Sequence, residues 1–427
     1  MLSEQVLYWI WLARACGVAS KSFVRLIERF ETPFDIYSLG EEQIEYIEGI
    51  GNQLKLKLSD KNLEPSYSVL KFCKKNRVDI ITYADKRYPS SLRRLEDPPA
   101  LLFCRGSFPD FNSRLCIAVV GTRKMSEYGK EAAYKIAYEM AAANAVVVSG
   151  MALGIDGVAS GGAIAAGGDT VAVLGSGIDV VYPKQHSKLY DKIVRSGAVI
   201  TEFMPSSTPD KYNFPVRNRI ISGLCQGTLV VEGDRKSGSL ITAKTAITQG
   251  REVFALPGQI YESNSEGPNE LIRNGAYAAL GADDIINHYD FLYHDVINYR
   301  GLKKAKSHSE LDEEFLEELN ICARSYKKEE LVQSESAPVA QKEAEKKTSK
   351  EESAKTEVAR TSENEEMLAG LDENTRRIFS QMPMDSAVSP DALVEDGFGA
   401  SDVITALTML ELCGLVTSLP GGLYIRK

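Results

Sequence analysis

Short apolar runs alternate with helical segments through the middle of the chain. From residue 116 onward, runs rich in Val, Ile and Ala are separated by 15 to 25 residues with helical apolar spacing. Strands that are apolar on both faces are typical of a parallel sheet covered by helices. The pattern predicts a Rossmann-like, doubly wound α/β domain of six strands over residues 112–290. The runs are CIAVVG, AVVVSG, TVAVLG, AVITEF, GTLVVEG and REVFALPG.

The stretch before this domain has a different pattern. Residues 1–75 carry helical spacing with short breaks, and a Gly-Ile-Gly turn at residues 49–51 follows Ile44 and Ile47. This resembles a helix-hairpin-helix (SAM-like) module, whose glycine turn either contacts a phosphate or serves only as a tight turn. Residues 76–111, punctuated by prolines, are expected to form an extended connector.

The C-terminal third divides into three segments. Residues 291–326 continue as a helical extension, with Leu311, Phe315 and Leu319 at intervals of four. Residues 327–367, rich in Lys, Glu, Ser and Ala, predict a disordered acidic linker. Residues 368–427 read as three helices and a hairpin, the order of a winged-helix domain. Its third helix lacks Lys and Arg, which favours a protein-contact or regulatory role over major-groove binding.

Composition and charge narrow the class of protein. The chain has 427 residues, 44% hydrophobic and 26% charged, which is typical of a globular protein of several domains. No apolar run approaches the roughly 20 residues of a membrane span, and the N-terminus lacks signal-peptide features, so a soluble, cytoplasmic protein is expected. Net charge is +1 over residues 1–111, −1 over 112–290 and −9 over 291–427. The central domain can therefore carry a local cationic site.

The titratable residues argue against common catalytic centres. Seven cysteines include no CxxC pair, and the four histidines lie outside the motifs described below. We therefore expect no metal, no cofactor and no histidine-based catalytic centre.

Glycines follow four of the predicted strands. In a parallel sheet these strand ends share one edge, where helix N-termini also point, so ligands bind there. A missing side chain would let an anion approach the backbone closely. The glycines in question are Gly121, Gly150, Gly175, Gly177 and Gly238.

Cations accompany these glycines along the same edge. The run KYNFPVRNRIISG places Arg217, Asn218 and Arg219 in the predicted first turn of a helix, where cations oppose the macrodipole unless an anion is bound. Ser237 and Ser239 stand at another helix start, where helix capping and ligand contact are equally compatible with their hydroxyls. The cations of this edge are Arg123, Lys184, Lys211, Arg217, Arg219, Arg235, Lys236 and Lys244.

Six motifs in this order resemble the DNA-processing protein A family (DprA, also called Smf): VVGTR, SGxAxGID, VLGxGxDxxYP, FPxRNRIISG, VVEGxxxSGSLITA and GREVFALPG. The resemblance implies a homodimeric protein without enzymatic activity. It would bind single-stranded DNA without strong sequence preference and load the RecA recombinase onto it, notably in natural transformation. By motif, the implied phosphate ligands are Arg123, Lys184, Lys211, Arg217 and Arg219, with Asn218, Ser237 and Ser239 completing the pocket.

The chain departs from the family pattern at two positions. Leu153 stands where a basic residue is usual, and Ser160 where a histidine is usual. One contact is therefore expected to be missing or rearranged. Tyr212 and Phe214 are candidates for base stacking, with a core position favoured for Phe214.

Two enzyme classes share this general sheet. A lysine-decarboxylase-like (LOG-type) nucleotide hydrolase is the main alternative, with Glu202 and Glu232 as candidate acid or base, but its PGGxGTxxE motif is absent. An NAD-dependent dehydrogenase is disfavoured because VVGTRKMSEYG does not keep the GxGxxG spacing.

Overall fold

The structure is a computed structural model that describes two units separately. It describes residues 2–321 continuously, and further on residues 373–382, 388–390, 415–419 and 423–426 with five single residues between them. Residues 1–324 form one compact unit and residues 325–427 a second. The predicted linker over 327–367 lies outside the described residues.

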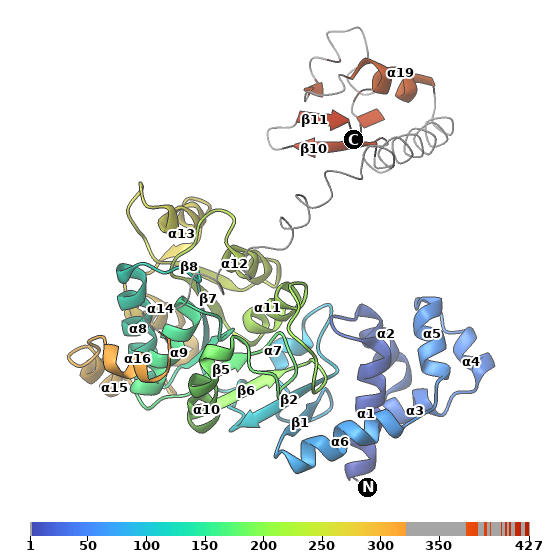
Figure 1. Ribbon diagram of the computed structural model, residues 1–427, viewed down its shortest axis with the longest axis horizontal. Helices are drawn as coiled ribbons and strands as arrows, with labels where there is room; N and C mark the ends of the chain where they lie inside the picture. Colours follow the sequence, from blue (N-terminus) through green and yellow to red (C-terminus); the bar gives the residue numbers. More distant parts are fainter. Residues whose placement is uncertain are drawn as a thin grey trace, which may run out of the picture. The chain divides into compact units, whose positions relative to one another are not determined.

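Six helices build the N-terminal part of the first unit (Figure 1). The short helix after Thr32 begins with a capping box, in which Thr32 and Asp35 satisfy each other's backbone N–H groups. The Gly-Ile-Gly turn separates the fourth and fifth helices, and Gly49 takes the left-handed conformation at φ +78°. The helices are α1 (Leu2–Cys16), α2 (Lys21–Phe30), α3 (Pro33–Tyr37), α4 (Glu41–Glu45), α5 (Asn52–Ser59) and α6 (Glu64–Lys75).

The described residues contain one nine-stranded sheet, in the order β1-β2-β6-β5-β4-β3-β7-β8-β9. The six predicted strands are all present as β3 to β8, and they run parallel to one another. Residues 76–111, expected to be a connector, supply β1 and β2, and β2 pairs antiparallel with β6. The strands are β1 (Asp79–Thr82), β2 (Leu101–Gly106), β3 (Cys116–Val120), β4 (Val146–Ser149), β5 (Thr170–Val173), β6 (Gly197–Thr201), β7 (Gly227–Val230), β8 (Glu252–Ala255) and β9 (Tyr277–Ala278).

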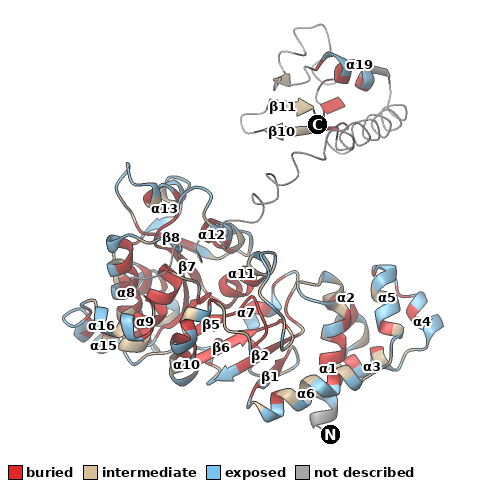
Figure 2. Ribbon diagram, viewed as in Figure 1, coloured by how far each residue is buried: buried red, intermediate tan, exposed pale blue. Residues whose placement is uncertain are grey.

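Helices cover both faces of the sheet, and Figure 2 shows the strands as the buried centre. Alternate residues of each strand enter two separate apolar clusters, as the period of two requires. One cluster includes residues of α8 (Glu127–Ala142), α9 (Ile155–Ala165), α10 (Ser187–Ser196) and α14 (Ala282–Tyr293). The other includes residues of α7 (Ser90–Arg93), α11 (Asn213–Leu224) and α12 (Gly238–Thr248). Two further elements near the sheet are the 3₁₀ turn η1 (Lys184–His186) and α13 (Ser263–Arg273).

The N-terminal helices share a core with the sheet. Trp9 and Phe23 belong to the same apolar cluster as Phe103 of β2 and Ile117 of β3. At the surface of this junction, Lys21 of α2 pairs with Glu96 at 2.5 Å. The first unit therefore has one continuous core across its helical and α/β parts.

The predicted helical extension forms α15 (Tyr299–Ala305) and α16 (Glu313–Glu318), which pack against the α/β domain. Leu316, Leu319 and Ile321 are buried in the main core cluster, next to α9. Gly161 of α9 leaves room for Leu316, since a Cβ there would lie 2.6 Å from Leu316 Cδ2. Phe315, by contrast, is only partly buried.

The C-terminal unit contains α19 (Glu373–Gln381) and a hairpin of β10 (Val416–Leu419) and β11 (Leu423–Arg426). Ile378, Leu393, Val403, Leu407 and Leu410 form its separate apolar core. Helix, core and hairpin agree with the predicted winged helix. All described side chains of the predicted third helix are buried in this core.

Two kinds of feature are absent from the described residues. No described helix is long and apolar enough to cross a bilayer. Nor do three or more His, Cys, Asp or Glu side chains within the described ranges come together in a way that could hold a metal ion.

Candidate nucleic-acid interface

The candidate site lies along the carboxyl-terminal edge of the parallel strands, which we call the rim. It comprises the loops after β3, β4, β5, β6, β7 and β8, which contain or precede the glycine turns of the six motifs. The six strands β3 to β8 run parallel to one another, which brings these loops to the same edge of the sheet.

Phe214 is the centre of the rim. The Arg123 guanidinium carbon lies 5.8 Å from the centre of its ring, and that of Arg217 lies 5.7 Å from it. The ring of Tyr182 is 5.5 Å away, centre to centre. Loops after β3 and β5 and the start of α11 therefore meet here. Phe214 is half-buried in this cluster, rather than a fully buried core residue.

Arg217 is the buried cation of this cluster. Its Nη1 donates to the backbone oxygens of Gly150, at 2.9 Å, and Val173, so one side chain joins α11 to the ends of β4 and β5. Burial lowers the pKa of Arg217 to about 10, which leaves it charged at neutral pH. It holds two rim loops together and contributes a fixed positive charge beneath them.

Asp156 is the buried counter-charge. Its carboxylate accepts hydrogen bonds from the backbone N–H groups of Gly150 at 3.0 Å and Ala152 at 3.4 Å. Burial raises its pKa, while Arg217 and these two hydrogen bonds act in the opposite direction. Sequence reasoning did not assign a role to Asp156, although it stands in the GID motif, because its partner Arg217 is distant in sequence.

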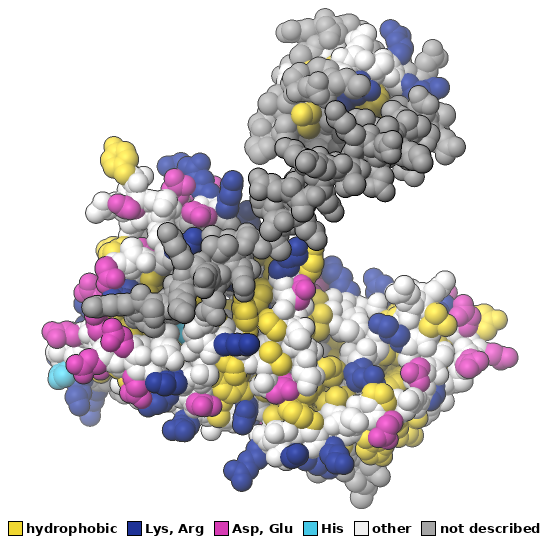
Figure 3. Space-filling view, in the orientation of Figure 1, with side chains coloured by type: hydrophobic (Ala, Val, Ile, Leu, Met, Phe, Trp, Pro, Cys, Tyr) yellow, Lys and Arg dark blue, Asp and Glu magenta, His cyan; other side chains and the backbone are white. Residues whose placement is uncertain are grey.

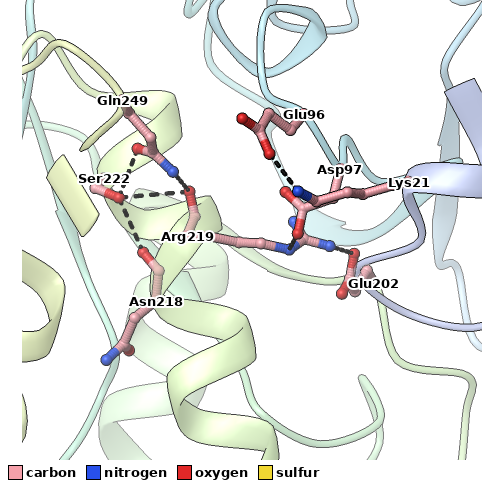
Figure 4. Close-up of polar contacts among 8 residues, drawn as sticks. All are labelled: Lys21, Glu96, Asp97, Glu202, Asn218, Arg219, Ser222 and Gln249. Carbon is pink, nitrogen blue, oxygen red and sulfur yellow. Dashed lines mark hydrogen bonds and ion pairs between the residues drawn. The ribbon is translucent and has the colours of Figure 1, made fainter. Parts of the chain in front are cut away.

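Arg219 differs from Arg217 although both come from the same motif. It is buried, and its guanidinium pairs with Glu202 at 2.5 Å and Asp97 at 3.3 Å (Figure 4). Burial raises the pKa of Glu202, and Arg219 is the main group opposing this rise. Helix α11 also begins at Asn213, so both arginines lie beyond its first turn. We assign Arg219 a structural role, in place of the phosphate contact that the sequence suggested.

Two other predicted cations are exposed. Lys184 opens the 3₁₀ turn two residues after Tyr182, and Lys211 lies 5.1 Å from the ring centre of Tyr212 just before α11. Within the described ranges, no ion pair holds Arg123, Lys184 or Lys211. These three cations are available to an anionic ligand.

Asn218 and the two serines make intramolecular contacts. The side-chain oxygen of Asn218 accepts a hydrogen bond from Arg217 Nε at 3.2 Å. Ser237 caps α12 by accepting from the N–H of Ser239 at 3.4 Å, and the two hydroxyls are 2.9 Å apart. Capping is therefore observed, and it leaves ligand contact open because an oxygen can accept and donate at once.

The space beside most of the predicted glycines is occupied by the protein itself. A Cβ at Gly150 would lie 2.7 Å from Arg217 Nη2, and one at Gly175 would lie 3.0 Å from the Phe214 ring. At Gly121 it would meet Ile155, and at Gly177 the backbone at Met204 and Ser206. Only Gly238 of the five is open on this side. At four of these glycines the missing Cβ makes room for the chain's own side chains or backbone, and their close approach to an anion stays a prediction.

The two carboxylates of the hydrolase alternative are engaged in the fold. Glu202 pairs with Arg219, as described above. Glu232 accepts from the backbone N–H of Ser126 at 2.9 Å and from its hydroxyl at 2.5 Å, at the start of α8. Both carboxylates thus have structural partners.

The two departures from the family pattern have different surroundings. Ser160 is buried in α9 and its hydroxyl donates to the backbone oxygen of Asp156 at 3.1 Å. Leu153 is half-exposed in the loop after β4. The hydroxyl of Ser160 is thus accommodated inside the fold, whereas Leu153 places an uncharged side chain at the rim.

The surface view agrees with a mixed basic and apolar face. Figure 3 shows Lys and Arg side chains interspersed with hydrophobic ones over the α/β domain. Among the exposed apolar side chains at the rim are Tyr212 and, after β8, Ile260 and Tyr261. Sequence reasoning missed the last two because no motif marks them.

Comparison with known proteins agrees with this architecture. A family model described as DNA recombination-mediator protein A matches residues 79–290, and one described as DprA winged helix domain matches residues 362–422. The DNA processing protein DprA of Streptococcus pneumoniae is 35% identical over 295 residues, covering 66% of this chain and 98% of that protein. DprA of Bacillus subtilis is 41% identical over 217 residues, covering 51% of this chain and 73% of that protein.

A solved structure gives the same result. The X-ray structure of DNA processing protein A from Streptococcus pneumoniae superimposes with a TM-score of 0.59 at 34% identity, covering 66% of this chain and 97% of that one. The match in sequence, fold and domain order leads to one conclusion: the chain belongs to the DNA-processing protein A (DprA/Smf) family.

Proposed function

We propose that this protein binds single-stranded DNA along the rim, without strong sequence preference, and loads the RecA recombinase onto it during transformation and recombination. The observation that carries the proposal is the convergence of Arg123 and the Tyr182–Lys184 loop on Phe214, with Lys211 and Tyr212 just before it. Lysine ammonium and arginine guanidinium groups are suited to binding phosphates, and an exposed aromatic ring is suited to stacking on a base.

Contacts within the protein support a binding role of this kind. Arg217 and Asp156 hold the loops after β4 and β5 through hydrogen bonds to their backbone. The exposed cations are thus presented by loops that are already fixed, which reduces the ordering needed on binding. Phosphate contacts carry no sequence information, so this site is suited to a sequence-independent ligand.

We further propose that the protein acts as a homodimer through the α/β domain. Strand β9 is the outer strand of the sheet, and both of its residues are exposed. Nearby in sequence, Leu280 is 78% exposed, and Phe291 of α14 is 95% exposed. An unpaired edge with exposed apolar side chains is suited to pairing with a second copy.

The DNA-binding proposal is tested by substituting the exposed cations. Arg123→Ala and Lys184→Ala are each expected to weaken binding to a mixed-sequence oligonucleotide, measured by fluorescence anisotropy. A plot of the logarithm of the binding constant against the logarithm of the salt concentration should have a slope of about −2 for three exposed cations. Each substitution should make this slope shallower by about 0.7.

Lys303→Ala is the matched control because Lys303 is an exposed lysine on α15. It should leave both the affinity and the salt slope unchanged. Equal binding by all four proteins would refute the assigned site.

A further inference from the structure

The loop between β8 and α13 carries the most exposed aromatic ring of the rim. Ile260 is 75% exposed and Tyr261 is 93% exposed, in adjacent positions. The loop follows the carboxyl end of β8, so it belongs to the same sheet edge as Arg123. No motif and no contact of the central cluster involves these two residues.

Hydrogen bonds fix both ends of this loop. Gly258 exchanges two hydrogen bonds with the Asn269 side chain, at 3.2 and 3.0 Å, and Pro257 O accepts from the Tyr128 hydroxyl at 2.7 Å. On the other side, Asn264 donates to Lys124 O at 2.9 Å and accepts from Gly233 N–H at 2.7 Å. The loop is therefore tied directly to the loops after β3 and β7, and Tyr261 projects from a fixed base.

Both carboxylates and cations lie around Tyr261, since Glu262 follows it directly and is exposed. Arg235 and Lys236 are exposed in the loop after β7, which lies between the β3 and β8 ends, and Lys124 is the next residue after Arg123. Arg235 is partly balanced by Glu266 at 3.5 Å and Glu270 at 3.6 Å, whereas Lys236 has no ion pair among the described residues. A cation thus lies on the path between the central cluster and the exposed ring.

The rings of the central cluster, Phe214 and Tyr182, are partly buried. Phe214 has two guanidinium groups, the Tyr182 ring and the Gly175 backbone around it. Binders of single strands without sequence preference combine cations with accessible rings on which bases stack. The most exposed rings at the rim are those of Tyr261 and of Tyr212, which is 71% exposed, and the ring of Tyr128 is 50% exposed.

The rings of Tyr212 and Tyr261 lie in different parts of the rim. Tyr212 lies two residues before Phe214, against which Arg123 of the loop after β3 packs. Tyr261 follows β8, and two strand spacings separate β8 from β3 in the sheet. A bound strand must therefore extend beyond the central cluster to reach Tyr261.

Resting on the proposed function, we infer that Tyr261 is a nucleobase-stacking site at the β8 end of the DNA path. A strand held by Arg123 and Lys184 passes Lys236 and places one base on the Tyr261 ring. Ile260 supplies the adjacent apolar contact. The site takes any base, because every base has a π-face.

The test compares oligonucleotides of about 4 and about 16 nucleotides, the limits of common single-strand site sizes. With the full chain and fluorescence anisotropy, Tyr261→Ala should weaken binding of the longer oligonucleotide between about 5-fold and about 150-fold. Affinity for the shorter oligonucleotide, which the central cations hold, should change less than about twofold. Tyr261→Phe should keep wild-type affinity, and Tyr261→Trp should show fluorescence quenching when the longer oligonucleotide is added.

Two controls separate this inference from other outcomes. Tyr67→Ala removes an exposed aromatic of α6 and should leave both affinities unchanged. If Tyr261→Ala binds the longer oligonucleotide like wild type, or changes the molecular mass in light scattering rather than the affinity, the inference is overturned. If Arg123→Ala weakens neither oligonucleotide, the proposed function fails instead.

Discussion

Two arginines of α11, two positions apart in the sequence, have different roles. Arg217 donates to strand-end carbonyls at the rim, and Arg219 joins Glu202 of the β6 end to Asp97 before β2. The motif RNR shows two cations, and only the direction in which each side chain leaves the helix separates their roles. Burial of the ion group of Arg219 makes that residue important for folding.

Substituting Arg219 tests this structural role. Arg219→Met should lower the free energy of unfolding by about 3–5 kcal/mol, because Glu202 and Asp97 would be left without their cation in a buried site. Chemical denaturation measures the loss. Arg195→Met, at an exposed position of α10, is the control and should change it little.

The same variant separates folding from binding. Folded Arg219→Met should bind single-stranded DNA within about twofold of wild type, since one phosphate contact alone would change affinity more. A protein of normal stability with reduced affinity would instead make Arg219 a phosphate ligand.

His186 is expected to make stability depend on pH. It is fully buried, its Nδ1 lies 3.1 Å from Met151 O, and burial lowers its pKa from 6.5 to about 4. Between these values the unfolded chain takes up a proton that the folded chain refuses, so stability falls as the pH falls from 6.5 to 4. The loss is about 3 kcal/mol at pH 4.

His186→Gln isolates this effect, because the amide can still donate to Met151 O but does not titrate. Urea unfolding at pH 7 and pH 4 should show that the variant loses about 3 kcal/mol less than wild type. The difference between the two proteins removes the contributions of Glu202 and Asp156, whose raised pKa values act with the opposite sign. Parallel pH curves for the two proteins would contradict the assignment.

The sequence predicts part of the site at this scale. Arg123, Lys184 and Lys211 are exposed cations at the predicted edge, since strand ends and motif positions suffice to place them. The direction of Arg219 could not be predicted, because its partners Asp97 and Glu202 lie in segments far apart along the chain. Tyr261 has no sequence signal, as exposure of a single ring depends on how its loop is held.

At the scale of elements, close packing of α8 on α9 depends on one glycine. A Cβ on Gly162 would lie 2.4 Å from the backbone oxygen of Tyr134 in α8. At Gly161, one residue earlier, the nearest atom is the end of the flexible Leu316 side chain, at 2.6 Å. The two glycines therefore differ in whether the neighbouring atom can move.

Alanine at each position tests this difference. Gly162→Ala should destabilise the protein by at least about 1–3 kcal/mol, because two helix backbones must separate. Gly161→Ala should stay within about 1 kcal/mol of wild type, since Leu316 can turn aside and alanine favours the helix by about 1 kcal/mol. Urea midpoints of the two variants provide the measurement, and equal losses would show that Leu316 cannot move.

The apolar runs predicted all six strands of the parallel sheet because strands buried on both faces leave a continuous signal. The antiparallel strands β1 and β2 were not predicted. Strand β1 has four residues, and it becomes recognisable only by its pairing with β2, which in turn pairs with β6. Prolines around these strands favoured an extended connector, and an extended chain is compatible with joining a sheet edge.

At the scale of the whole molecule, the exposed edge near β9 predicts the oligomeric state. Leu280→Glu should convert a dimer into a monomer of 46.9 kDa in light scattering, because a charge would have to be buried in the interface. Leu56→Glu, at a similarly exposed position of α5, should leave the mass unchanged. A wild-type protein that is already monomeric would exclude the proposed dimer.

The continuous core of the first unit has a consequence for the choice of a shortened protein. The family model for the α/β domain covers residues 79–290, yet Trp9 on one side and Leu316 on the other complete the same apolar cluster. A fragment limited to 79–290 would keep the strands and rim motifs while exposing the surfaces that these flanking residues cover. The segment recognised by sequence is thus smaller than the packed unit, which extends through residue 321.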